Sequence, residues 1–218
     1  VEPAMFGHAA GIAIELWLEH EAQPGRSVAQ FHEWMTGSGL LYLKDHLPYV
    51  ATIFTTHATI LGRALSSTGL PPAAALGHRT PEEAADQVGV RAKHSIEGAV
   101  ARAADVFTTV SAITAAEVEL MHRRQAQPVV PNGLDLGLLA ELSDSAHHEE
   151  ARTALTHLAS CMCGEDLRQA TLLVISGRYE MHNKGIDVLL DALAQINSQP
   201  GRSLVCFLLI PAAQSGPR

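Results

Sequence analysis

Short apolar runs alternate with amphipathic stretches along most of the chain. Runs rich in β-branched residues predict strands at Ser27–Phe31, Val50–Thr56, Val106–Val110, Pro128–Pro131, Thr171–Ser176 and Leu204–Ile210. Apolar residues at helical spacing predict helices at 8–22, 36–46, up to about Ser66, 90–104, 114–124 and 184–197. Residues 67–89 predict a loop with one short helix at Pro81–Gln87, and Thr114-x-x-Glu117 fits a capping box. Strands that alternate with helices are typical of an α/β fold with parallel sheets.

The pattern also predicts where domains meet. Residues 137–169 are polar and rich in histidine, which indicates a helical connector. We therefore expect residues 1–136 to belong to one Rossmann-like domain and residues 170–218 to begin a second one. On this interpretation both domains are incomplete, and the start at Val1 without an initiator methionine predicts a truncated segment.

The amino-acid composition argues against some classes of binding partner. The 218 residues are 47% apolar and 17% charged, which is ample for a buried core. A net charge of −8 argues against duplex DNA or an anionic membrane surface as the main partner. No leader and no run long enough to span a bilayer is visible. We therefore expect no nucleic acid and no membrane partner.

Cysteine and histidine spacing predicts neither disulfides nor a metal site. Cys161, Cys163 and Cys206 form no disulfide framework, which favours a reducing, cytoplasmic compartment and buried or partly buried thiols. No His, Asp or Glu grouping has ligand spacing, so we expect no metal.

Polar clusters follow five of the predicted strands. Because ligands bind beyond the carboxyl ends of parallel strands, these clusters are candidates for one site. They are Phe31-His32-Glu33-Trp34, Thr55-Thr56-His57-Ala58-Thr59, Thr108-Thr109-Val110-Ser111, Pro131-Asn132-Gly133 and Gly177-Arg178-Tyr179-Glu180 with Asn183-Lys184-Gly185.

Arg178 follows the predicted strand at Thr171–Ser176, and Lys184 opens the next predicted helix. Both side chains can point into one crevice, where a helix N-terminus and two cations favour a diphosphate. The alternative is a surface arginine paired with Glu180 and a solvated lysine, and spacing alone favours this alternative.

Three residues of the first cluster, and His57 of the second, allow two interpretations each. His32 either hydrogen-bonds a sugar hydroxyl or is a core histidine satisfied by backbone groups. Glu33 either acts as an acid or base or pairs with a cation, and Trp34 is better explained by packing than as a sugar platform. Periodicity does not decide whether His57 caps a helix or belongs to a site.

Six blocks, in order, resemble the glycogen synthases of the animal, fungal and Bacteroides type, which form glycosyltransferase family 3. The blocks cover nearly the whole chain, and the Phe-Thr-Thr-His-Ala-Thr and Gly-Arg-Tyr-Glu runs are the most specific. They are Phe31–Gly37, Thr52–Arg63, Ala92–Glu97, Ala104–Ala115, Pro131–Leu134 and Gly177–Glu180 with Asn183–Gly185.

The resemblance implies a GT-B architecture, in which two Rossmann-like domains face a cleft. It implies transfer of glucose from UDP-glucose to the 4-hydroxyl of a growing α-1,4-glucan with retention of configuration, without a metal or other cofactor. Arg178 and Lys184 match the diphosphate-binding pair of the family, and His32 matches the histidine near the reacting centre. Asn132 lies in the Pro-Asn-Gly turn that lines the cleft. A homo-oligomer is compatible with this identity.

The chain also departs from the family pattern. Gln30 stands where the family usually has histidine or a small polar residue. The glycine-bearing loop of the family lies before Val1, and its glutamates near the nucleotide lie after Arg218, so we expect these 218 residues alone to be inactive. Two rival functions remain open: another GT-B glycosyltransferase, and a non-catalytic module that binds a nucleotide or a glucan.

Overall fold

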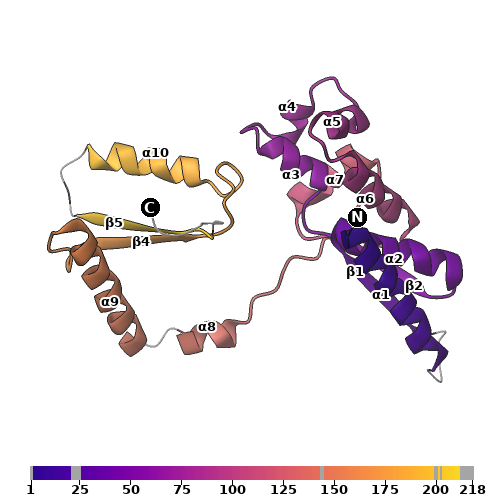
Figure 1. Ribbon diagram of the computed structural model, residues 1–218, viewed down its shortest axis with the longest axis horizontal. Helices are drawn as coiled ribbons and strands as arrows, with labels where there is room; N and C mark the ends of the chain where they lie inside the picture. Colours follow the sequence, from indigo (N-terminus) through magenta and orange to yellow (C-terminus); the bar gives the residue numbers. More distant parts are fainter. Residues whose placement is uncertain (1, 21–25, 143–144, 199–200, 202, 212–218) are drawn as a thin grey trace. The chain divides into compact units, whose positions relative to one another are not determined.

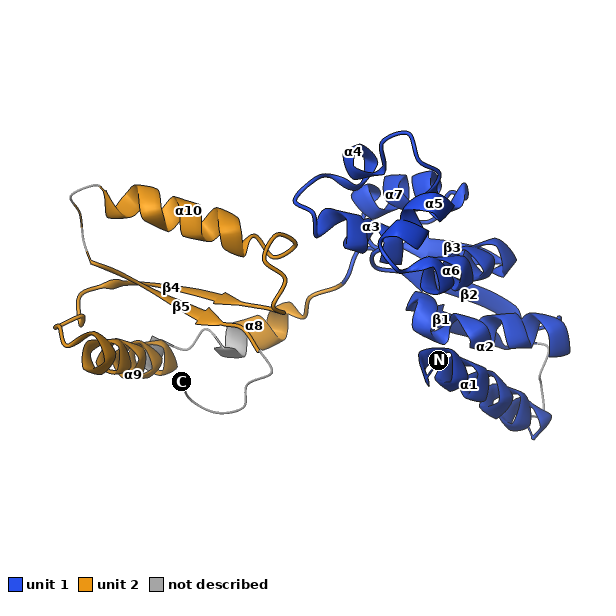
Figure 2. Ribbon diagram, turned by 45° about the horizontal axis from the view of Figure 1, so that its top comes forward, with its two compact units in different colours: residues 1–132 blue, residues 133–218 orange. Residues whose placement is uncertain are grey.

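The chain forms two compact units, residues 1–132 and 133–218 (Figure 2). A computed structural model describes residues 2–20, 26–142, 145–198, 201 and 203–211. Each unit is α/β with parallel strands, as predicted. The assignment of the units to the two domains of a glycosyltransferase stays a prediction.

Unit 1 contains a three-stranded parallel sheet in the order β1-β2-β3 (Figure 1). Its strands are β1 (Val28–His32), β2 (Ala51–Thr56) and β3 (Val106–Thr109). Phe31 pairs with Phe54, and Phe54 pairs with Phe107. The rings of Phe54 and Phe107 stack with centroids 5.5 Å apart, so this register places aromatic side chains at the centre of the core.

Within the described residues of unit 1, seven helices connect or cover these strands. They are α1 (Glu2–Glu19), α2 (Glu33–His46), α3 (Ile60–Ser66), α4 (Pro72–Leu76), α5 (Pro81–Gln87), α6 (Arg91–Ala103) and α7 (Ala112–His122). Helix α2 packs against both α1 and α6 (Figure 1). A second apolar cluster joins α3, α4, α5 and Met121 of α7, so the segment between β2 and β3 has a core of its own.

Glycines allow α1 and α2 to pack closely. A Cβ on Gly39 would overlap the carbonyl oxygen of Gly7 and lie 2.8 Å from a ring carbon of Phe31. A Cβ on Gly7 would lie 2.5 Å from the hydroxyl of Ser38. Any larger residue at these positions therefore requires the two helices to separate.

Unit 2 contains α8 (Leu136–Leu142), α9 (Ser145–Cys163), β4 (Thr171–Ser176), α10 (Ile186–Asn197) and β5 (Leu204–Leu209). Strands β4 and β5 pair in parallel from Thr171–Leu204 to Ser176–Leu209. Figures 1 and 2 both show α9 and α10 on opposite faces of this pair. Ala159 of α9 packs near Val205 and Phe207, which anchors α9 to the sheet.

Four local predictions differ from the structure, apart from shifts in the bounds of elements. Residues 72–76 form a helix that the pattern did not predict. The predicted strand at 128–131 is a single bridge between Thr109 and Val129, since Pro128 and Pro131 lack the N–H groups that a ladder needs. The other two differences concern a helix cap and the cysteines.

The predicted capping box at Thr114 and Glu117 is wrong. Helix α7 begins after Ser111, whose hydroxyl accepts from the backbone N–H of Thr114. Glu117 instead accepts from the backbone N–H of Thr59. A capping box does occur earlier in the chain, between Thr80 and Glu83 at the start of α5.

The cysteines are more exposed than predicted. Cys161 and Cys163 are exposed on α9, and only Cys206 is partly buried. All three are free thiols, as expected without a disulfide framework. Separately, none of the helices in the described ranges combines the length and apolar character needed to cross a bilayer.

Candidate functional site

The carboxyl ends of β1, β2 and β3 are tied together by threonine hydroxyls. Thr55 and Thr108 share a hydrogen bond of 2.8 Å, and Thr109 Oγ1 donates to the carbonyl of Thr56 at 2.9 Å. Gln30 Nε2 donates to Thr55 Oγ1 at 3.1 Å. The side chain of Gln30, where the chain departs from the family pattern, thus adds a hydrogen bond to this edge. These hydrogen bonds fix the edge of the sheet from which the polar side chains His32 and His57 extend.

His32 and His57 meet above this edge. His32 ends β1 and His57 follows β2, and 3.2 Å separates His32 Nδ1 from His57 Nε2. One ring therefore donates to the other, and the tautomers are linked. His32 is exposed and His57 is half-buried. The core-histidine interpretation of His32 is wrong, because its ring faces solvent and a side chain rather than buried backbone groups.

Glu33 adopts a backbone conformation that is rare for its residue type. Its φ of 63° lies in the left-handed region, which costs on the order of 1–2 kcal/mol for a residue with a Cβ. This conformation lets Glu33 Oε1 accept from the backbone N–H of His57 at 2.8 Å. Glu33 is thus a positioning residue for His57. Strain of this kind is concentrated at functional sites.

Trp34 is half-buried and contacts helix α6. The ammonium of Lys93 on α6 lies 5.4 Å from the centre of its ring, a cation–π contact between α2 and α6. This contact agrees with the packing interpretation of Trp34, and the absence of a sugar-binding role stays a prediction.

Two glutamates, Glu97 fully buried and Glu117 half-buried, fix the loop that follows β2. Glu97 Oε2 accepts from the backbone N–H of Ile60 at 3.1 Å, and Glu117 Oε1 accepts from the backbone N–H of Thr59 at 3.2 Å. The Thr59 hydroxyl also donates to Glu117, and it accepts from Gly62 N at 2.9 Å to cap α3. Both carboxylates hold the turn after His57 in place. Sequence reasoning missed them because they come from α6 and α7.

Asn132 lies in the exposed turn at the end of unit 1. The segment before it follows β3, since Gln127 N donates to Phe107 O and Val130 N donates to Thr109 O, each at 2.7 Å. Asn132 therefore lies beyond the same edge of the sheet as His32 and His57.

Arg178 and Lys184 both lie in the loop between β4 and α10. The Arg178 guanidinium is 3.1 Å from Glu180 Oε1, with 58% of the arginine side chain exposed. The predicted alternative, an exposed pair with Glu180, is therefore confirmed as a contact. The stem of Lys184 lies 3.7 Å from the position of a Cβ on Gly177, so it packs beside the residue before Arg178.

A second side-chain pair, His182 and Asp187, connects the same loop to the first turn of α10. His182 Nδ1 lies 2.7 Å from Asp187 Oδ2, and this hydrogen bond lowers the pKa of Asp187. Gly185 precedes α10 with φ of 64°, a left-handed conformation that turns the chain into the helix. The loop therefore ends, and the helix begins, directly after Lys184.

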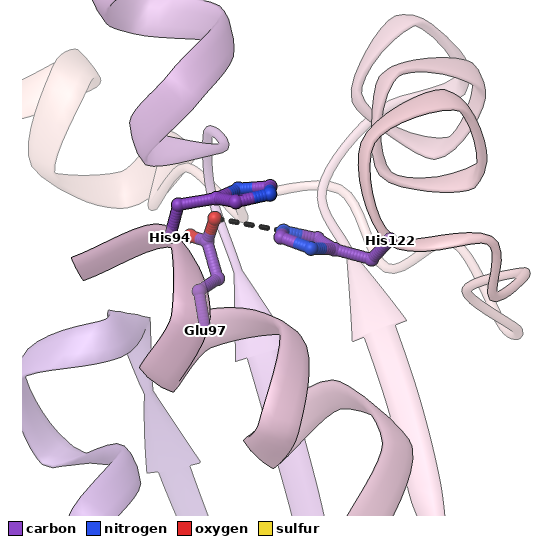
Figure 3. Close-up of side chains that lie close together, drawn as sticks. All are labelled: His94, Glu97 and His122. Atoms are coloured by element: carbon purple, nitrogen blue, oxygen red, sulfur yellow. Dashed lines mark hydrogen bonds and ion pairs between the residues drawn. The ribbon is translucent and has the colours of Figure 1, made fainter. Parts of the chain in front are cut away.

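One further cluster of titratable side chains escaped sequence reasoning. His94, Glu97 and His122 are buried, and their potential ligand atoms lie within 4.8 Å of one another (Figure 3). His94 and Glu97 share a face of α6 at a spacing of three residues, and His122 comes from α7. The spacing of His94 and Glu97 was the only available signal.

Comparison with known proteins identifies the family. The family model described as glycogen synthase matches residues 2–216. The chain is 34% identical to a glycogen [starch] synthase of Dictyostelium discoideum over 224 residues, covering 97% of this chain and 25% of that protein. It is 37% identical to isoform 2 of the Saccharomyces cerevisiae enzyme over 202 residues, covering 85% of this chain and 28% of that protein.

A liver glycogen [starch] synthase of Rattus norvegicus is 34% identical over 200 residues, with the same coverage as the yeast protein. The chain therefore spans 25–28% of the length of these curated relatives. With a family model that matches almost from end to end, the chain belongs to the glycogen synthase family.

Proposed function

We propose that the intact gene product containing this chain is a glucosyltransferase of the GT-B type. It transfers glucose from UDP-glucose to the 4-hydroxyl of an α-1,4-glucan with retention of configuration. The bond between the anomeric carbon and the diphosphate oxygen breaks, a bond to the acceptor oxygen forms, and the acceptor proton leaves with UDP. Family membership supports this proposal, because the relatives are named glycogen [starch] synthases.

The observation that supports the mechanism is that Arg178 and Lys184 both lie in the loop between β4 and α10. Negative charge grows on the diphosphate as the glycosidic bond breaks, and fixed cations stabilise that charge. Arg178 is held by one exposed pair, which contributes about 0–1 kcal/mol and is readily exchanged for a diphosphate. The ammonium of Lys184 has no hydrogen-bond or ion-pair partner within the described part of the chain.

His32 is the proposed contact to the sugar. It is exposed, and its hydrogen bond with His57 fixes the ring orientation. Glu33 holds the backbone of His57, so a strained residue supports the pair. Asn132 is the proposed lining residue beyond β3. The proposed site residues are therefore His32, Asn132, Arg178 and Lys184.

The proposed chemistry needs no metal, because two cationic side chains can neutralise the departing UDP. We also propose a reducing cytoplasmic compartment, supported by the free and exposed thiols of Cys161 and Cys163. The proposed partners are UDP-glucose and an α-glucan. A homo-oligomer stays a prediction.

Transfer of labelled glucose from UDP-glucose to glycogen by the intact gene product tests the proposal. Arg178→Gln and Lys184→Gln should each lower kcat on the order of 100-fold or more, because each removes a cation that acts in the transition state. Arg168→Gln is the matched control, since Arg168 forms an exposed pair with Asp166 elsewhere in unit 2. The control should keep its rate within about twofold.

Three results would contradict the proposal. Full activity of both glutamine variants would remove Arg178 and Lys184 from the mechanism. Formation of sucrose or trehalose in place of a longer glucan would support another GT-B glycosyltransferase. Binding of UDP or maltooligosaccharides by the intact gene product without turnover would support a non-catalytic module. Glucose incorporation by the 218 residues alone would refute their predicted inactivity.

A further inference from the structure

A pocket of about 370 Å³ lies between α6 and α7, and none of the proposed transferase residues lines it. Its wall includes Arg91, Arg102 and Arg123, with Glu82 as the acidic lining residue. His94 and His122 form part of the same wall. The lining residues carry more positive than negative charge, which favours an anionic ligand in this acidic chain.

Two of the three guanidiniums are available to a ligand. Arg91 pairs with Asp86 at 3.0 Å, and half of its side chain is exposed. For Arg102 and Arg123, no guanidinium hydrogen bond or ion pair occurs within the described residues. Arg123 ends α7 with a φ of 55°, a left-handed conformation that projects it beside His122. An anion would therefore meet unpaired arginines.

Gly98 leaves open the space where two nitrogen atoms converge. A Cβ on Gly98 would lie 3.0 Å from His122 Nδ1 and 3.2 Å from Arg102 Nη1. A ligand oxygen in this region therefore approaches an imidazole and a guanidinium together. Gly98 is buried in the middle of α6, so the opening is part of the helix surface itself.

The imidazole of His122 is oriented by a buried carboxylate. His122 Nε2 lies 2.9 Å from Glu97 Oε2, and both side chains are almost fully buried. Since a carboxylate only accepts, Nε2 carries the hydrogen and Nδ1 is left to face the pocket. A phosphoryl oxygen can accept from Nδ1 of the doubly protonated ring, and a P–OH group can donate to Nδ1 of the neutral ring.

His94 adds an unsatisfied group at the same place. Its ring stacks on His122 with centroids 4.8 Å apart and planes inclined by 24° (Figure 3). The residue is 4% exposed, and its Nδ1 has no hydrogen-bond partner within the described residues. Buried polar atoms are rarely left unpaired, so this atom indicates a missing ligand or water.

A metal ion fits this cluster less well than an anion does. Imidazoles bind metals through lone pairs in the ring plane, and those of two stacked rings do not converge on one point. Glu97 already accepts from Ile60, His122 and Thr56, so its oxygens are engaged. Three arginines beside the site would repel a divalent cation.

We propose that this pocket binds a phosphoryl group, either as inorganic phosphate or as the phosphate of a small phosphomonoester. Arg102 and Arg123 pair with its oxygens, and His122 Nδ1 contacts it from the floor beside Gly98. The proposal stands independently of the transferase activity.

Calorimetric titration of the 218-residue chain with inorganic phosphate and with methyl phosphate tests the proposal, with chloride at matched ionic strength as reference. Arg102→Gln and Arg123→Gln should each weaken binding about tenfold, because each removes one charge-assisted contact. Lys93→Gln is the matched control, since Lys93 lies on α6 but contacts Trp34 outside the pocket. Gly98→Ala should weaken binding without changing the charge.

Each outcome decides the proposal. Saturable binding of either phosphate that is lost in the arginine variants and kept in Lys93→Gln supports it, and the tighter of the two identifies the ligand as free or esterified. Binding no stronger than that of chloride overturns it, as does an equal loss in the Lys93 control. Tight Zn²⁺ binding abolished by His94→Ala, without phosphate binding, would overturn it in favour of a metal site. Circular dichroism verifies that each variant is folded.

Discussion

Replacement of Glu97 should be among the most destabilising single changes in unit 1. Its carboxylate is fully buried and accepts from Ile60 N at 3.1 Å and from His122 Nε2 at 2.9 Å, while the contact from Thr56 Oγ1 is longer at 3.4 Å. Glu97→Ala leaves these donors unpaired in the core. The expected loss in free energy of unfolding is about 3–5 kcal/mol.

Glu97→Gln separates the charge from the packing. The amide keeps the size of the side chain and one acceptor oxygen, but neutral hydrogen bonds are roughly half as strong as charge-assisted ones. We expect Glu97→Gln to cost about 1–2 kcal/mol. Because domains typically have about 5–15 kcal/mol of stability, both losses are measurable.

Urea unfolding at pH 7, followed by tryptophan fluorescence, measures both changes. The two tryptophans, Trp17 and Trp34, are both in unit 1, so the signal reports on that unit. Glu119→Ala is the control, since Glu119 is exposed on the same helix as His122 and its carboxylate accepts only from Gln125 among the described residues. The control should change stability by about 0.5 kcal/mol or less. Equal losses for Glu97→Ala and Glu119→Ala would show that the buried network does not hold the turn after β2.

Two further changes test the packing and the charges of unit 1. Gly39→Ala should destabilise the chain by about 1–3 kcal/mol despite alanine's better helix propensity, because its Cβ would overlap Gly7; a raised melting temperature would contradict the close approach of α1 and α2. Hydrogen bonds from Lys44 and Thr52 lower the pKa of Asp105 to about 2, so its stabilisation is complete above about pH 4 and is lost as the pH falls through 2. Since 46% of this side chain is exposed, Asp105→Asn should cost only about 1 kcal/mol at pH 7 and less at pH 2.5, and an equal cost at both pH values in urea titrations would refute this reasoning.

Local patterns were sufficient for most elements. β-branched and apolar runs identified β1, β2, β3, β4 and β5 to within one or two residues, and the helices between them were also identified, except α4. Helix α1 begins six residues before the predicted start at residue 8, and residues 21 and 22 of the predicted helix lie outside the described residues. Proline caused the clearest error in the sheet, because periodicity does not register the missing N–H groups of Pro128 and Pro131.

The sequence alone determined the fold class, the family and the order of the strand-end motifs, since each depends on residue types at short spacing. Tertiary structure decided which side chains meet. Glu117 binds the backbone N–H of Thr59 and not a local helix cap. Glu33 has a left-handed backbone and accepts from the backbone N–H of His57. His94 and Glu97 of α6 lie beside His122 of α7. A carboxylate bonds to whichever donor the packed core brings near, and a linear pattern carries no information about distances between separate helices.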